Sequence, residues 1–81
     1  MDPIKQRLVN AFAAVFPDLS EEEIASASQA SVATWDSVAA LTLLNVIEEE
    51  FGIQVDIDVL PDLVSFDLIL DYLKSRPDAA A

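Results

Sequence analysis

The stretch between Asp36 and Gly52 constrains the fold of this chain more than any other part of its 81 residues. Asp36 is a good N-cap residue, because its carboxylate can accept hydrogen bonds from the backbone N–H groups of a first helical turn. Gly52, the only glycine in the chain, is a natural C-terminal stop. The apolar residues between them recur at helical spacing, which predicts a largely buried helix with Ser37 in its first turn. They are Ala40, Leu43, Leu44, Ile47 and Phe51, with Leu41 and Val46 expected to widen the buried face.

A second helix is predicted at the start of the chain. Asp2 suits the cap position, and Pro3 suits the first helical position, where its missing N–H costs no hydrogen bond. An apolar stripe at helical spacing follows and ends before Pro17, which predicts a helix over 3–16. The stripe consists of Ile4, Leu8, Ala11, Phe12 and Val15.

The last helix is predicted to begin after Ser65, which can act as its N-cap. Lys74 and Arg76 lie toward its C-terminal end, where the helix dipole favours cations. The folded domain is therefore expected to occupy residues 1–76, with 77–81 as a disordered tail. The buried face of this helix is predicted to contain Phe66, Ile69, Leu70 and Leu73, with Tyr72 at its edge.

The connection 17–35 between the first two main helices is long, and a structureless loop of that size is uncommon in a compact domain. Part of it is expected to be ordered, because Ser20 and Glu23 have the spacing of a capping box. That pattern predicts one or two helical turns reaching Ser26, followed by irregular loop. Trp35 directly precedes the cap of the central helix, and we expect it to pack as a hydrophobic staple.

The stretch after the central helix alternates Ile53, Val55 and Ile57 with polar residues, as a short strand would. A single strand would have no partner in this chain, so we expect an extended loop with Ile53 and Val55 buried. Asp56 or Asp58 can cap a short helical piece that follows. The predicted fold class is therefore all-α, a small bundle of three main helices plus one short helix, with a long first loop.

The composition disfavours several classes of function. The chain has no cysteine and no histidine, so it lacks a disulfide framework, the usual general base and the usual metal ligand. Asp56 and Asp58 resemble the opening of an EF-hand loop, but the glycine and the final glutamate of that loop are missing, so no metal site is expected. No apolar run approaches the ~20 residues that span a bilayer. No signal-peptide-like segment follows Met1. We expect a cytoplasmic domain that is not an enzyme.

The charge is strongly one-sided, with a formal net charge of −11 from 15 acids and four bases. Thirteen of the acids lie between Phe16 and Arg76, and no base lies from Leu8 to Leu73. Nucleic-acid binding needs the opposite sign and is excluded, and insertion into or binding to an anionic membrane is disfavoured. Such a surface is expected to attract basic protein surfaces. The alternative is that the acids only keep a small domain soluble.

Alone, Asp36-Ser37 is most simply a helix cap, but its context is more specific. Asp-Ser-Val at 36–38, apolar residues at helical spacing, and Glu-Glu-Glu-Phe-Gly-Ile at 48–53 together resemble the attachment-site helix of the acyl carrier proteins. Leu-Val-Ser-Phe at 63–66 and the apolar residues that follow resemble the final helix of that family. The resemblance covers most of the chain.

This resemblance implies a function. In the family, the serine after the aspartate carries a 4′-phosphopantetheine arm, so Ser37 is the expected attachment point, with Asp36 beside it. The chain would hold acyl intermediates as thioesters for fatty acid, lipid or polyketide-like biosynthesis. A phosphopantetheinyl transferase would attach the arm from coenzyme A. The resemblance also implies a monomer that shelters the acyl chain in its bundle, and first and second main helices that run in similar directions.

The expected partners are basic surfaces of acyl-transferring or condensing enzymes. The predicted partner-binding residues are Val38, Leu41, Thr42, Asn45, Glu48 and Glu49. Fatty-acid-synthesis carriers usually have acids where this chain has Ala39 and Thr42, and often a bulky apolar residue where it has Asn45. These departures make a specialised carrier at least as good an interpretation as a housekeeping one. Two alternatives stay open: a peptidyl carrier module, against which Asp36 argues, and an unmodified acidic interaction domain.

The charge distribution generates a prediction about stability. Thirteen acids with no base among them repel one another in the folded chain. Salt shortens the range of that repulsion to about 10 Å at 0.1 M. The melting temperature, followed by circular dichroism, is therefore expected to rise with sodium chloride, and more steeply with magnesium chloride. A melting temperature that stays flat or falls across the titration would contradict this account.

Overall fold

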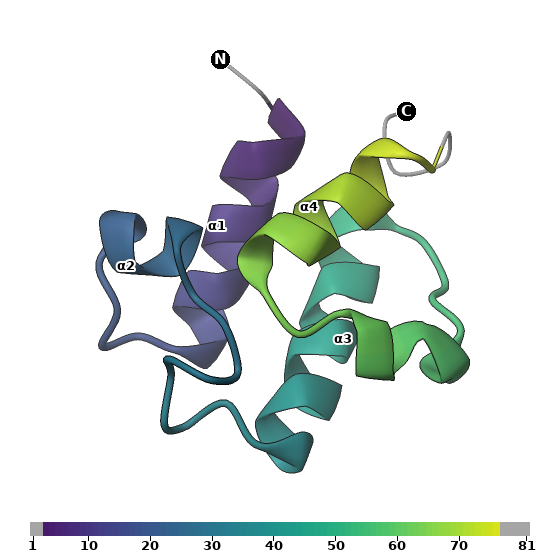
Figure 1. Cartoon of the computed structure of the whole chain (residues 1–81). Coiled ribbons are helices and arrows are strands. Elements are labelled where there is room, and N and C mark those ends of the chain that lie inside the picture. The colour runs from purple at the N-terminus through teal and green to yellow at the C-terminus, as the bar shows by residue number, and fades with distance from the viewer. Residues whose placement is uncertain (1–2, 77–81) are drawn as a thin grey trace.

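The computed structural model describes residues 3–76, and this part of the chain folds into five helical segments (Figure 1). They are α1 (Pro3–Val15), α2 (Glu21–Ala25), α3 (Ser37–Phe51), the 3₁₀ helix η1 (Ile57–Asp62) and α4 (Phe66–Lys74). The predicted all-α class with three main helices is confirmed. The short segments α2 and η1 lie where the sequence indicates helical turns. The expected cap Asp2 and the expected tail 77–81 lie outside the described residues.

The helices α1 and α3 run in opposite directions (Figure 1). Near the start of α1, the Arg7 guanidinium donates to the Glu50 carboxylate (3.4 Å) and to the Glu50 backbone carbonyl, close to the end of α3. Near the end of α1, Phe12 stacks edge-on against Trp35, just before α3 begins, with ring centroids 5.4 Å apart. The expectation that the two helices run in similar directions is therefore wrong. A long connection permits either direction, and side-chain packing at both ends of α1 selects the antiparallel one.

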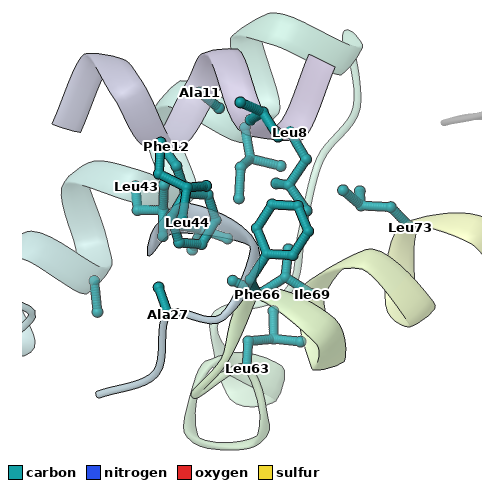
Figure 2. Close-up of a cluster of buried hydrophobic side chains, with 14 of the residues drawn as sticks. Leu8, Ala11, Phe12, Ala27, Leu43, Leu44, Leu63, Phe66, Ile69 and Leu73 are labelled. Atoms are coloured by element: carbon teal, nitrogen blue, oxygen red, sulfur yellow. The ribbon is translucent and has the colours of Figure 1, made fainter. Parts of the chain in front are cut away.

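The core lies between α1, α3 and α4 (Figure 2). Phe12 and Phe66 are among the largest fully buried side chains, and their rings pack edge to face with centroids 5.2 Å apart. The predicted buried face of α3 is confirmed, except that Leu41 is 43% exposed and Val46 is half-buried. Leu41 lies partly outside the buried face because it follows Ala40 by one residue, or 100° around the helix. On α4, Phe66, Ile69 and Leu73 are buried and Leu70 is half-buried. The buried face of α3 consists of Ala40, Leu43, Leu44, Ile47 and Phe51.

The long first connection is partly ordered, as expected. Ser20 and Glu23 form the predicted capping box: the Ser20 hydroxyl accepts from the Glu23 N–H at 3.2 Å, and the Glu23 carboxylate accepts from the Ser20 N–H at 2.9 Å. The hydrogen bond from the Ser20 backbone N–H, followed by a contribution from the Ser20 side chain, holds the pKa of the Glu23 carboxyl below its ordinary value. The reciprocal bonds satisfy two donors at the start of α2 and so begin the helix at this point.

The loop after α2 is irregular, but it is anchored to the segment that leads into α4. The Phe66 N–H donates to the Ala27 carbonyl and the Gln29 N–H donates to the Val64 carbonyl, both at 2.9 Å. Ala27 is buried. Since these bonds join residues nearly forty positions apart, no local pattern in the sequence predicts them.

The return from α3 to α4 begins at Gly52, whose left-handed conformation (φ 63°) ends the helix as predicted. Ile53 and Val55 are then buried, also as predicted. The Asp56 carboxylate accepts from the Asp58 N–H at 2.9 Å and caps η1. No residue of η1 is buried, so this segment lies on the surface of the core.

Candidate functional site

Ser37 is the first residue of α3 and is exposed. Asp36 precedes it with an extended backbone, and the Asp36 Oδ1 accepts a hydrogen bond from the Ala39 N–H at 2.8 Å. The predicted cap is therefore confirmed. The cap leaves the Ser37 hydroxyl at the positive end of the helix dipole, on the surface of the protein.

A surface groove of about 570 Å³ runs beside Ser37. One wall belongs to the first turns of α3 and the other to η1 and the residue Val64. The full lining is Gln29, Ser37, Ala40, Leu41, Ile57, Leu60, Pro61 and Val64. Most of these side chains are apolar, so the groove suits a long, partly apolar ligand that starts at Ser37.

A small, half-open cavity of about 10 Å³ lies between α3, η1 and α4. Ala40 and Leu60 line both this cavity and the groove, so the two are neighbours. Leu60 is only half-buried and belongs to η1, which has no buried residue. The cavity is lined by Trp35, Ala40, Leu43, Leu44, Ile47, Leu60, Leu63 and Ile69.

Trp35 is buried, with 4% of its surface exposed, and it packs on α1. Its ring lies 5.4 Å from that of Phe12 and 5.8 Å from that of Phe16. Its indole Nε1 is buried and has no hydrogen-bond partner among the residues that the structure describes. Leaving such a donor unpaired costs about 1–3 kcal/mol. The sequence predicts that Trp35 packs as a staple on the helix that it precedes, whereas its aromatic partners Phe12 and Phe16 lie at the end of α1. Neither these partners nor the unpaired N–H has a signal in the sequence.

The basic residues lie far from Ser37. Arg7 binds Glu50 at the far end of α3, and the Arg76 guanidinium donates to the Gln54 carbonyl at 2.7 Å, just beyond that end. At 1.5 Å per residue, α3 separates these contacts from Ser37 by about 20 Å. The contacts of Arg7 and Arg76 therefore lie at the end of α3 opposite Ser37.

Within residues 3–76, no group of three or more acidic, cysteine or histidine side chains is arranged to hold a metal ion. Asp56 and Asp58 instead take part in the cap of η1. In the same part of the chain, no helix is both long enough and apolar enough to cross a membrane.

Comparison with known proteins identifies the family. No protein-family model matches the chain. The chain is 34% identical over 82 residues to the mitochondrial acyl carrier protein of Saccharomyces cerevisiae, and the alignment covers 96% of this chain. This chain belongs to the acyl carrier protein family. It spans 66% of the length of that relative. The small bundle with three main helices agrees with the resemblance seen in the sequence.

In this acyl carrier protein, most of the predicted partner-binding residues form one exposed row along α3. The row consists of Val38, Leu41, Thr42, Asn45 and Glu49, at helical spacing and opposite the buried face. Val38 is 73% exposed and Leu41 is 43% exposed, so two large apolar side chains of this row face solvent. Glu48 differs, because it is half-buried and its Oε2 accepts from the Val55 N–H at 2.9 Å. That bond holds the loop after α3.

The sequence does not reveal the second wall of the groove. Ile57 was expected only as part of an alternating stretch, yet it is 59% exposed and lines the groove that starts at Ser37. Ile57 and Pro61 are each followed by an exposed aspartate, Asp58 and Asp62. The one signal for this wall is Ile57, an exposed apolar residue that lies between Asp56 and Asp58 in the sequence. It becomes recognisable once η1 is seen to lie beside α3.

The geometry of the cap generates a prediction about Asp36. Replacing Asp36 by Ala removes the acceptor of the Ala39 N–H and is expected to lower the free energy of unfolding by about 1 kcal/mol. Asp36→Asn keeps an acceptor at that position and is expected to stay close to wild type. Urea unfolding of the three proteins measures both effects. Equal losses in the two variants would show that the charge, and not the hydrogen bond, stabilises the helix start.

Proposed function

We propose that this chain carries acyl intermediates as thioesters on a 4′-phosphopantetheine arm attached to Ser37. The observation that best supports this is the position of Ser37: exposed at the start of α3 and at the mouth of an apolar groove. A small apolar cavity that shares Ala40 and Leu60 with the groove lies beside it. Membership of the acyl carrier family supports the general carrier role.

The residues around Ser37 fit such an arm. A phosphodiester on the Ser37 oxygen would lie beside the first N–H groups of α3, which have no carbonyl partner within the helix. Asp36 occupies only the N–H of Ala39. The groove residues Leu41, Ile57 and Val64 can contact the apolar parts of the arm. When bound, the arm supplies the thiol of the thioester, which the chain itself cannot supply because it has no cysteine.

The attachment step requires a second protein. The sequence contains no histidine, and no lysine or arginine between Leu8 and Leu73, so no such base lies near Ser37. A phosphopantetheinyl transferase would take the proton of the Ser37 hydroxyl. The Ser37 oxygen would then bond to phosphorus as the diphosphate bond of coenzyme A breaks and the nucleotide 3′,5′-bisphosphate leaves. In this proposal the chain is a carrier and not an enzyme.

Partner enzymes are proposed to dock on the exposed row of α3. Val38 and Leu41 offer apolar contact, while Asp36 and Glu49 attract basic surfaces. Charge complementarity of this kind speeds association without demanding tight binding, which suits a carrier that must visit several enzymes. A monomer would leave this row free. A peptidyl carrier module and an unmodified acidic interaction domain remain the alternatives.

The pathway is proposed to be lipid, fatty acid or specialised, polyketide-like biosynthesis. Ala39 and Thr42 replace the acids that are usual next to the serine, and both lie in the first turns of α3. This favours a specialised carrier. The sequence predicts a location in the cytoplasm, whereas the S. cerevisiae relative is mitochondrial by name. We therefore propose either of these two compartments as the location of this chain.

The attachment site can be tested by intact mass. Incubation with coenzyme A and a transferase of broad specificity is expected to add one phosphopantetheine to the wild type and none to Ser37→Ala. Ser31→Ala, which changes another exposed serine in the preceding loop, serves as the matched control and is expected to react fully. An unmodified wild type, or a modified Ser37→Ala, would overturn the carrier proposal.

Partner choice can be tested by restoring the missing charges. Ala39→Asp with Thr42→Glu is expected to raise the specificity constant for malonyl transfer by a fatty-acid-synthesis transacylase several-fold at low salt. Each exposed charge pair contributes about 0.2–1 kcal/mol, mainly through the association rate, and salt screens it. The gain is therefore expected to shrink at high salt.

Asn45→Met is the comparison variant for this test. Because it adds an apolar contact, any gain that it produces is expected to persist at high salt. No gain from the double variant at low salt would show that charge is not what sets this carrier apart.

A further inference from the structure

The groove beside Ser37 contains one polar side chain besides the serine itself, and that side chain is Gln29. The other lining residues are alanine, leucine, isoleucine, proline and valine. Gln29 belongs to the loop between α2 and α3, where every other residue from Ala25 to Thr34 is alanine, serine, valine or threonine. It is exposed, and its side-chain amide makes no hydrogen bond to any residue that the structure describes. An amide group therefore stands at an otherwise apolar groove with its hydrogen-bonding capacity unused by the protein.

The backbone of Gln29 is fixed even though its side chain is exposed. Its N–H donates to the Val64 carbonyl, and the Phe66 N–H donates to the Ala27 carbonyl, both at 2.9 Å. These two bonds flank an antiparallel bridge at Ser28. Side chains alternate in direction along an extended segment, so that of Gln29 is expected on the same side as that of buried Ala27. This places the amide at the groove and limits the freedom that it loses when it binds.

The chemistry of Gln29 matches that of the arm proposed for Ser37. A phosphopantetheine arm contains two amide groups, separated by methylene groups. The glutamine side chain has an acceptor oxygen and two N–H donors, so it can pair with the C=O or the N–H of another amide, or with both. A carboxylate could only accept from that amide, and an ammonium group could only donate to it. The apolar lining residues suit the methyl and methylene groups of the arm.

We propose that the side-chain amide of Gln29 hydrogen-bonds an amide group of the arm on Ser37, and so holds the resting arm along the groove. The inference rests on the proposed function, because it requires the arm. Gln29 is then a positioning residue that acts on the arm, whatever acyl group the arm carries. Because this hydrogen bond is exposed, water competes with it and its net contribution is small. A weak contact suits an arm that has to leave the groove to enter the active site of a partner enzyme.

The first test follows the arm. Unlabelled protein is loaded from coenzyme A that is ¹⁵N-labelled in both amides, so that only the arm amides are observed. In the wild type at least one of them is expected to exchange with solvent about two- to ten-fold more slowly than in Gln29→Met, the range that one net hydrogen bond corresponds to. Methionine has a similar length and no amide. Equal exchange rates in the two proteins would overturn the proposal.

Gln54→Met is the matched control for this test. Gln54 is also an exposed glutamine, but it does not line the groove. Its replacement is expected to leave the exchange of both arm amides at the wild-type rates. If Gln54→Met accelerated the exchange as much as Gln29→Met, the effect would not come from a contact in the groove, and the proposal would be wrong.

The second test observes Gln29 itself. In ¹⁵N-labelled protein, its side-chain NH₂ resonances are identified by their loss in Gln29→Met. They are expected to shift when the arm is attached and to show nuclear Overhauser contacts with the arm, while those of Gln6 and Gln54 stay in place. Gln29 resonances that neither shift nor show contacts would mean that this amide faces only water, and the inference would fail. This measurement needs no stable variant beyond the one used for assignment.

A structural role for Gln29 gives a different result. Because its side chain has no hydrogen bond to the described residues, Gln29→Met is expected to keep the melting temperature of the protein without the arm. Failure of the inference also differs from failure of the carrier function. A wild type that accepts no phosphopantetheine by mass is not a carrier. A wild type that is loaded, but whose arm amides exchange as they do in Gln29→Met, is a carrier that lacks this contact.

Discussion

The aromatic cluster of Phe12, Phe16, Trp35 and Phe66 is the interaction on which the rest of the structure depends. Phe12 is at its centre, with ring centroids 6.0, 5.4 and 5.2 Å from those of Phe16, Trp35 and Phe66. Tilted and edge-to-face pairs of this kind add about 0.5–1.5 kcal/mol each to the burial of their surfaces. The cluster joins the end of α1, the residue before the Asp36 cap of α3 and the first residue of α4. A chain of 81 residues can build only a modest core, so few other contacts could replace it.

The cluster also places the functional site. Trp35 is followed directly by Asp36 and Ser37, so anchoring the indole in the core sets where α3 begins and where the serine emerges. The Asp36 cap then starts the helix at that residue. On the other side, the loop bonds to Ala27 and Gln29 hold the segment that leads into α4 beside the same region.

Stability and function make opposite demands on η1. Its residues line the groove and cover the cavity, yet none of them is buried. A segment with so little buried apolar surface opens at low cost, as binding lids generally do. The main helices are held by the core, and at one end also by Arg7, which lies 4.6 Å over the Phe51 ring. The fold therefore keeps its weak contacts on the side where a chain attached to Ser37 would enter.

The local features of this protein follow from its sequence alone. The caps at Ser20, Asp36 and Ser65, the stop at Gly52 and the buried faces of the helices depend on residues within four positions of one another, so helical spacing predicts them. The antiparallel pairing of α1 and α3, the outward turn of Leu41, the groove wall built by η1 and the unpaired indole of Trp35 depend on which distant segments pack together. Local sequence patterns do not predict these features, because a long connection permits more than one arrangement of the helices. Only the packing of the whole core selects one of these arrangements. The sequence thus determined that Ser37 begins the central helix, while the tertiary structure alone decided which residues surround it.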